Sequence, residues 1–170
     1  MVDAQGRDAE EGVLWQRTPA NMSGYLNMPE KTREVLTADG WYISGDVFRR
    51  DADGAYFFVG RTDDMFVCGG ENVFPGEVEH LLEQHPDIMQ ACVVPVPDEI
   101  KGEKPFAFVV TKPGSTLSED DVKRYALEHA PAYQHPRRVC FLDALPLAGP
   151  NKIDRKGLKQ RAAELWQVTA

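Results

Sequence analysis

The chain has 170 residues, of which 42% are hydrophobic and 27% charged, an ordinary composition for a globular protein with one core or two small ones. Its formal net charge of −8 provides no general basic surface for nucleic acid, and no apolar run approaches the roughly 20 residues that a membrane-spanning helix needs. The acidic, polar start of the sequence is unlike a signal peptide, so we expect a cytoplasmic protein.

The first part of the chain, residues 1–62, is predicted to form short β segments joined by turns. The expected elements are strands near 13–17, 24–29, 41–46 and 55–60, a short helix over 29–36 and a hairpin turn at 51–54. None of these pieces closes a core by itself. This part therefore resembles the end of a larger β-rich domain.

An acidic joint separates this part from the rest of the chain. The strand before the joint ends at Arg61, and the paired acids that begin at Asp63 cannot continue a buried strand. A new strand is expected over 65–68, and Pro75 is suited to the first turn of a helix. Two rigid pieces are therefore predicted to meet at this joint.

The second part, residues 63–170, is predicted to be a small α+β domain. Ser118 and Asp121 form a capping-box pattern at the start of one helix, and another helix follows Asp154. The expected fold is a β-hairpin and a small mixed sheet covered by about three helices. Its main strands are expected over 88–96, 105–111 and 138–143.

The cysteines and histidines do not indicate a metal site. Cys68, Cys92 and Cys140 each lie in an apolar, strand-like run, so we expect reduced, buried thiols. The four histidines show no paired spacing with one another or with cysteine that is typical of zinc ligands. No metal ligand is therefore assigned.

Three stretches carry residues suited to chemistry, and each also has a structural explanation. Asp46 follows a Ser-Gly pair, where a carboxylate can bind ribose hydroxyls or cap a turn. Arg61, expected across the hairpin, suits hydroxyls and phosphate, or a surface ion pair. Gly69 and Gly70 permit close approach of a ligand, or only a turn. Lys152, in a Gly-Pro-Asn loop, can stabilise developing charge or remain solvated.

The order, the spacing and the residues of these stretches are similar to the signatures of one family. GYLNMPEKTREVL and DGWYISGD are followed by DGAYFFVGRTDDMFVCGGENVFPGEVE, and then by the proline, asparagine and lysine of LPLAGPNKIDRKGL. With these motifs, residues 11–166 resemble the adenylate-forming ligases. This superfamily comprises acyl- and aryl-CoA synthetases, the adenylation domains of peptide synthetases, and luciferase.

The resemblance implies a reaction in two steps. A carboxylic acid is first joined to AMP, with ATP and Mg²⁺ as substrates, and a thiol then attacks the acyl adenylate. The resemblance assigns ribose binding to Asp46 and contact with ribose and phosphate to Arg61. It assigns the hinge between the half-reactions to Asp63, and the bridge between carboxylate and α-phosphate to Lys152.

The resemblance also implies residues for the thiol substrate. Gly69 and Gly70 match the backbone that borders the pantetheine tunnel. The sequence GGEN at 69–72 is more similar to CoA ligases and favours CoA as the acceptor. Tyr133, His135 and Arg137 occupy the stretch that meets the CoA nucleotide in some aryl-CoA ligases. The chain departs there from the family, which more often has lysine or arginine where this sequence has glutamine and histidine.

The resemblance places the phosphate loop, the acid pocket and the adenine-binding residues upstream of this sequence. We therefore expect the C-terminal part of an acyl- or aryl-CoA ligase, with 1–62 as the end of the large AMP-binding domain and 63–170 as the mobile cap. This part alone is expected to be inactive and to bind none of its ligands tightly. Its expected partners are the missing N-terminal domain, a carboxylic acid, ATP and CoA. Two alternatives stay open: an adenylation domain that loads a carrier-protein thiol, and a non-catalytic binding module.

Overall fold

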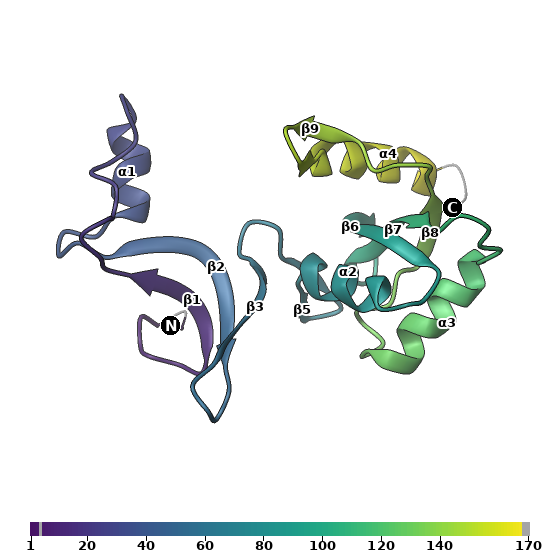
Figure 1. Cartoon of the computed structure of the whole chain (residues 1–170), viewed down its shortest axis with the longest axis horizontal. Helices are drawn as coiled ribbons and strands as arrows, with labels where there is room; N and C mark the ends of the chain where they lie inside the picture. The colour runs from purple at the N-terminus through teal and green to yellow at the C-terminus, as the bar shows by residue number, and fades with distance from the viewer. Residues whose placement is uncertain (4, 168–170) are drawn as a thin grey trace. The chain divides into compact units, whose positions relative to one another are not determined.

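The computed structural model describes residues 1–3 and 5–167, and the chain divides into two units, Met1–Asp63 and Asp64–Ala170 (Figure 1). Among the described residues, the first unit has one sheet and one helix, and the second unit has a five-stranded sheet, a two-stranded sheet and three helices. No helix in the described part of the chain is long and apolar enough to cross a membrane.

The first unit is built on an antiparallel sheet with the strand order β1-β2-β3. The elements are β1 (Glu11–Gln16), α1 (Pro29–Val35), β2 (Tyr42–Arg50) and β3 (Tyr56–Arg61). A hairpin turn joins β2 to β3, as predicted, and the Asp51 carboxylate accepts hydrogen bonds from the backbone N–H groups of Asp53 and Ala55.

The strand expected near 24–29 does not form, and that prediction was wrong. The segment turns into α1 instead. Asn27 has a φ of 57°, and the Thr32 hydroxyl accepts a hydrogen bond from the backbone N–H of Tyr25 at 2.9 Å. These local side-chain and turn contacts replace strand pairing because they satisfy the backbone groups before the helix.

The second unit is the predicted α+β fold. Its sheet has the strand order β5-β4-β7-β6, and β8 pairs with β7 in parallel, so the sheet is mixed. The elements are β4 (Phe66–Cys68), β5 (Glu71–Val73), α2 (Pro75–Glu83), β6 (Ile88–Asp98), β7 (Gly102–Thr111), α3 (Glu119–His129), β8 (Arg138–Phe141), β9 (Leu147–Gly149), β10 (Lys152–Ile153) and α4 (Arg155–Gln167).

Both faces of this sheet are covered, because side chains alternate along β6 and β7. Val93 and Val109 face a core shared with α2 and α3. Val94 and Phe108 face a second core that includes Leu158 of α4. Figure 1 shows α4 with β9 on one side of the sheet and α3 on the other. The long strands β6 and β7 are therefore buried on both sides.

The predicted start of α3 is confirmed. Ser118 Oγ accepts a hydrogen bond from the backbone N–H of Asp121 at 3.2 Å, and the Asp121 carboxylate accepts one from the backbone N–H of Ser118 at 3.1 Å. This reciprocal capping box satisfies donors that the first helical turn would leave without a partner. A local sequence pattern thus fixes where the helix begins.

Candidate functional site

Asp46 and Arg61 face each other across β2 and β3, as the hairpin spacing predicted. The two residues are paired in register, and Arg61 Nη1 donates to Asp46 Oδ1 at 2.7 Å. The sequence predicted a strand that ends at Asp46, whereas β2 continues beyond this residue to Arg50. The strand continues through this point because the carbonyl of Gly45 accepts a hydrogen bond from the backbone N–H of Thr62 at 2.9 Å.

The Arg61 guanidinium is held from two sides. Its Nε donates to Asp63 Oδ1 at 2.8 Å, and this hydrogen bond, together with the charges of Asp63 and Asp46, raises the pKa of Arg61. Gly45 has a φ of 75°, and a Cβ there would lie 3.1 Å from Arg61 Nη2. Glycine thus allows the guanidinium to lie against the β2 backbone. The predicted hinge residue Asp63 takes part in this cluster.

Lys152 lies on an exposed hairpin of the second unit. The predicted loop is formed by β9 and β10, in which Lys152 pairs with Gly149. Pro150 and Asn151 form the connection, and Asn151 has a φ of 55°, as the third residue of a type II turn requires. The hairpin therefore holds the lysine at the protein surface immediately before α4.

Gly69 and Gly70 form the two-residue connection between β4 and β5. Both have positive φ, 64° and 91°, which is the pattern of the hairpin turn called type I′. The N–H of Gly69 donates to the carbonyl of Lys101 at 3.0 Å, and the Lys101 side chain passes over Gly69. The turn alone explains both glycines, and it also exposes their backbone.

The structure brings together two of the three residues predicted to contact the CoA nucleotide. His135 is buried, its Nδ1 lies 3.0 Å from the carbonyl of Ala132, and Arg137 Nη1 lies 3.1 Å from its Nε2. Tyr133 instead packs against the core beneath α2 and α3. Burial lowers the pKa of His135, so the neutral imidazole donates through Nδ1 and accepts from Arg137 through Nε2.

An ion pair that sequence reasoning missed joins α2 to α4. Arg155 Nη1 and Nη2 donate to Glu79 Oε1 and Oε2 at 2.7 and 2.6 Å, a two-armed geometry. Glu79 is 9% exposed and also accepts a hydrogen bond from the backbone N–H of Val93 at 2.7 Å. This pairing raises the pKa of Arg155.

One sequence signal could have indicated half of this pair. Pro75, Val78, Glu79 and Leu82 form the buried stripe of α2, and a carboxylate in such a stripe needs a buried partner. Nothing in the local sequence identifies that partner, because Arg155 lies 76 residues away.

The cysteines are free thiols. The prediction of burial is right for Cys68 and Cys92, whereas Cys140 is only half-buried. Burial raises the pKa of the Cys92 thiol to about 12.

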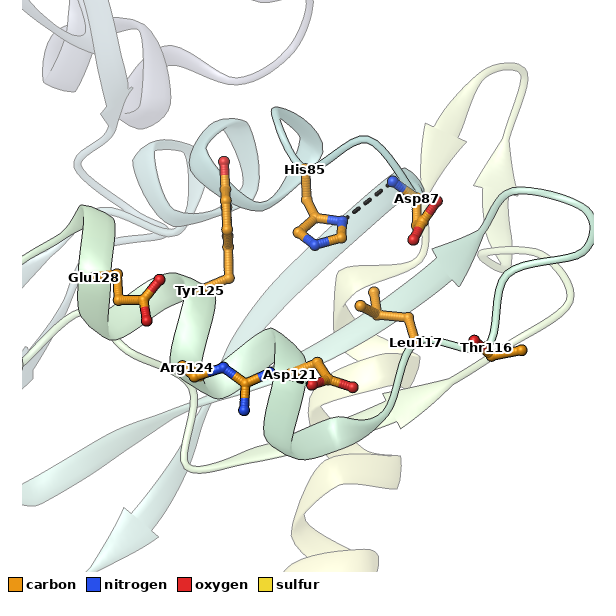
Figure 2. A pocket seen from close by; sticks show the side chains of 8 residues that line it. All are labelled: His85, Asp87, Thr116, Leu117, Asp121, Arg124, Tyr125 and Glu128. Atoms are coloured by element: carbon orange, nitrogen blue, oxygen red, sulfur yellow. Dashed lines mark hydrogen bonds and ion pairs between the residues drawn. The ribbon is translucent and has the colours of Figure 1, made fainter.

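A surface pocket of about 320 Å³ lies beside α3, apart from the predicted site residues (Figure 2). Figure 2 shows His85 next to the ring of Tyr125, and the two rings meet edge to face at 4.8 Å. Asp87, Asp121 and Glu128 contribute carboxylates to the lining. Because these three carboxylates outnumber Arg124, the one arginine of the lining, the pocket disfavours a phosphate ligand.

Comparison with known proteins identifies the class to which this architecture belongs. Residues 77–152 match the family model of the AMP-binding enzyme C-terminal domain. Residues 77–152 therefore carry the C-terminal domain of AMP-binding enzymes, and nearly the whole chain is similar to adenylate-forming enzymes.

Two curated relatives illustrate the similarity. The chain is 40% identical over 151 residues to 4-coumarate–CoA ligase-like 6 of Oryza sativa subsp. japonica, covering 89% of the chain and 25% of the relative. It is 39% identical over 160 residues to a ligase of Mycobacterium tuberculosis that joins a methyl-dioxo-octahydroindenyl propanoyl group to CoA, covering 94% and 32%. The chain thus spans a quarter to a third of these relatives.

Solved structures show a similarity to the same class of enzymes. The amide bond synthetase McbA from Marinactinospora thermotolerans superimposes with a TM-score of 0.88 at 34% identity, covering 95% of the chain and 33% of the synthetase. The anthranilate CoA ligase AuaEII, solved in complex with anthranoyl-AMP, gives a TM-score of 0.85 at 34% identity, covering 98% of the chain and 33% of the ligase.

Proposed function

We propose that this chain is the C-terminal part of an AMP-forming acid–thiol ligase, which makes an acyl or aryl adenylate and then its CoA thioester. The observation that carries the proposal is Lys152, held on an exposed hairpin immediately before α4 in a chain similar to CoA ligases. In the first step, a carboxylate oxygen attacks the α-phosphorus of ATP and pyrophosphate leaves. In the second, the sulfur of CoA attacks the acyl carbon and AMP leaves.

Lys152 acts in the first step only. An ammonium group between the substrate carboxylate and the α-phosphate reduces their repulsion and stabilises the negative charge that develops at phosphorus. A hairpin with polar, exposed residues suits this role because the lysine can reach a ligand outside its own unit's core. Removal of this charge slows adenylation and leaves the attack of the thiol unchanged.

Asp46 and Arg61 bind the nucleotide. A carboxylate accepts hydrogen bonds from both hydroxyls of a ribose, and a guanidinium donates to ribose and phosphate oxygens. Their contact at 2.7 Å orients both side chains before ATP arrives, which reduces the entropy cost of binding. Asp63, bonded to the same guanidinium, is the hinge residue between the half-reactions.

CoA is the proposed thiol, with Gly69 and Gly70 beside its pantetheine arm. Arg137 and Tyr133 are the candidates for its nucleotide end, whereas the burial and internal hydrogen bonds of His135 make it a support for Arg137. A carrier-protein thiol is the second candidate, because a fatty acid–[acyl-carrier-protein] ligase of Streptomyces coeruleorubidus is 38% identical over 164 residues.

A chimera tests the proposal. The chain replaces the matching region of a 4-coumarate–CoA ligase, and adenylation by pyrophosphate exchange is measured separately from thioester formation by preformed coumaroyl-AMP. The chimera with the unchanged sequence of this chain is expected to catalyse both steps. Lys152→Ala is expected to reduce adenylation by a factor of about 100 or more, as loss of a key charge-stabilising group does, and to spare the second step.

The matched control is Lys156→Ala, which removes an exposed lysine from the first turn of α4. It is expected to retain both activities. The isolated chain, which spans only a quarter to a third of its relatives, is expected to give no exchange. Equal loss in the Lys152 and Lys156 variants, or a chimera that folds but forms no adenylate, would contradict the proposal. A holo carrier protein as second acceptor distinguishes the two thiols.

A further inference from the structure

The hairpin that carries Lys152 has little packing of its own. Leu147, Ala148 and Gly149 are exposed, and β10 has only two residues, of which Ile153 packs against the core that includes Leu158 of α4, so the isolated hairpin would be marginally stable. Its position therefore depends on Ile153 and on its attachment to α4. The backbone N–H of Asp154 donates to the carbonyl of Pro146 at 2.8 Å, which closes the base of the hairpin directly before this helix.

The first residue of α4 is an arginine, which is unfavourable for the helix itself because a cation there opposes the helix dipole. Arg155 is directed instead to Glu79 of α2, with two hydrogen bonds at 2.7 and 2.6 Å, and its Nη1 also donates to the carbonyl of Val93 in β6 at 3.3 Å. The start of α4 is thereby attached to two other elements of the unit.

The same guanidinium reaches the beginning of the unit. Arg155 Nε lies 3.9 Å from Oδ2 of Asp64, the residue after the proposed hinge Asp63. One side chain therefore contacts α2, β6 and the first residue of the second unit. Arg155 is also only three positions beyond Lys152 in the sequence.

From these contacts we infer that Arg155, Glu79 and Asp64 are positioning residues for Lys152. The Glu79–Arg155 pair fixes the start of α4 and hence the base of the β9–β10 hairpin, and the Asp64 contact links this anchor to the residue after the hinge. The inference rests on the proposed role of Lys152 in adenylation. The contacts of Arg155 with Glu79 and Asp64 all lie within the second unit. Their effect on the stability of the hairpin can therefore be measured without any reaction.

The experiment uses a pair of substitutions that preserves the fold. Replacing a buried ion pair by groups of similar shape is often neutral for stability, whereas removing one partner leaves a buried charge. The double variant Glu79→Gln/Arg155→Met removes both charges, and the glutamine oxygen still accepts a hydrogen bond from the N–H of Val93. Arg124→Met, which removes a surface arginine of α3 that pairs with Asp121, is the matched control.

Hydrogen exchange on the full chain gives the first measurement. In the double variant, the amides of Asp154 and Leu158 are expected to exchange about tenfold faster or more, while the amide of Val122 in α3 is unchanged, because only the start of α4 loses its anchor. No change at Asp154 and Leu158, or an equal increase at Val122, would overturn the inference.

The chimera gives the second measurement. The double variant is expected to lower kcat of adenylation about tenfold, with KM for ATP and the thioester step from preformed adenylate unchanged, since the defect is in lysine placement. Equal losses in both steps would indicate a purely structural role and overturn the inference. An inactive parent chimera would contradict the proposed function, and hydrogen exchange would still decide whether the pair anchors the hairpin.

Discussion

Arg61 forms one ion pair across the sheet with Asp46, at 2.7 Å, and another along its own chain with Asp63, at 2.8 Å. All three side chains are substantially exposed, so water screens both contacts. The arrangement orients a guanidinium at the end of β3 without burying it. In the proposed function, the arrangement presents charged groups to the nucleotide, and its contribution to the stability of the sheet is small.

A double-mutant cycle tests that view of the Asp46–Arg61 pair. The variants Asp46→Asn, Arg61→Gln and the combination are expected to show a coupling free energy of unfolding below about 1 kcal/mol, as exposed pairs do. Urea unfolding followed by tryptophan fluorescence provides the measurement, in a Trp166→Phe background that leaves only Trp15 and Trp41, both in the first unit. A coupling energy above about 2 kcal/mol would mean that the pair is a structural element.

Asn151 is expected to control the Lys152 hairpin through its backbone conformation. Its φ of 55° is accessible to glycine without strain, but a Cβ-bearing residue such as alanine is destabilised there by about 1 kcal/mol. Asn151→Ala should therefore loosen the hairpin and reduce adenylation by the chimera several-fold, and Asn151→Gly should preserve both. Pyrophosphate exchange and amide exchange near Asp154 measure the two effects. If the glycine variant were the poorer of the two, the turn would not be the cause.

The parts of this molecule that could be predicted from sequence are those that local chemistry determines. The capping box at Ser118 spans four residues, and the Asp46–Arg61 contact is set by the length of one hairpin. The strand expected near residue 26 failed for a local reason as well: an asparagine with positive φ and a threonine side chain satisfied the backbone in another way.

The Glu79–Arg155 pair could not be predicted, because it depends on packing between segments far apart in the chain. The buried stripe of α2 indicates that Glu79 is unusual. Its partner Arg155 is identified only when α4 is seen to pack against β6. His135 shows the same limit. Its sequence context resembles a ligand-binding stretch, whereas its burial and its bond to Ala132 appear only in three dimensions.

The three thiols are expected to differ in reactivity. Cys92 is fully buried and its pKa is raised to about 12, so almost none of it is thiolate at mildly alkaline pH, and Cys68 is buried as well. Half-buried Cys140 should therefore give the fast phase with a disulfide reagent, of about one thiol per chain. Cys140→Ser should abolish this phase, and urea should make the remaining thiols reactive. A fast phase that persists in Cys140→Ser would contradict the assignment.

The buried imidazole of His135 is expected to make folding of the second unit sensitive to acid. Burial lowers its pKa below the ordinary value of 6.5, and the positive charges of Arg137, Lys123 and Lys101 act in the same direction. The unfolded chain therefore binds a proton more readily than the folded one. The stability contribution is present above pH 6.5 and is lost as the pH falls through the folded-state pKa.

Urea unfolding of the second unit between about pH 7.5 and pH 5 tests this, with His135→Gln as the variant. Glutamine can donate to the carbonyl of Ala132 but does not titrate, so the variant should start less stable and lose less stability on acidification. His80→Gln, at an exposed position of α2, is the control and should keep the wild-type slope. Parallel slopes for wild type and His135→Gln would show that other groups cause the acid sensitivity, because a group that no longer titrates cannot contribute to the pH dependence.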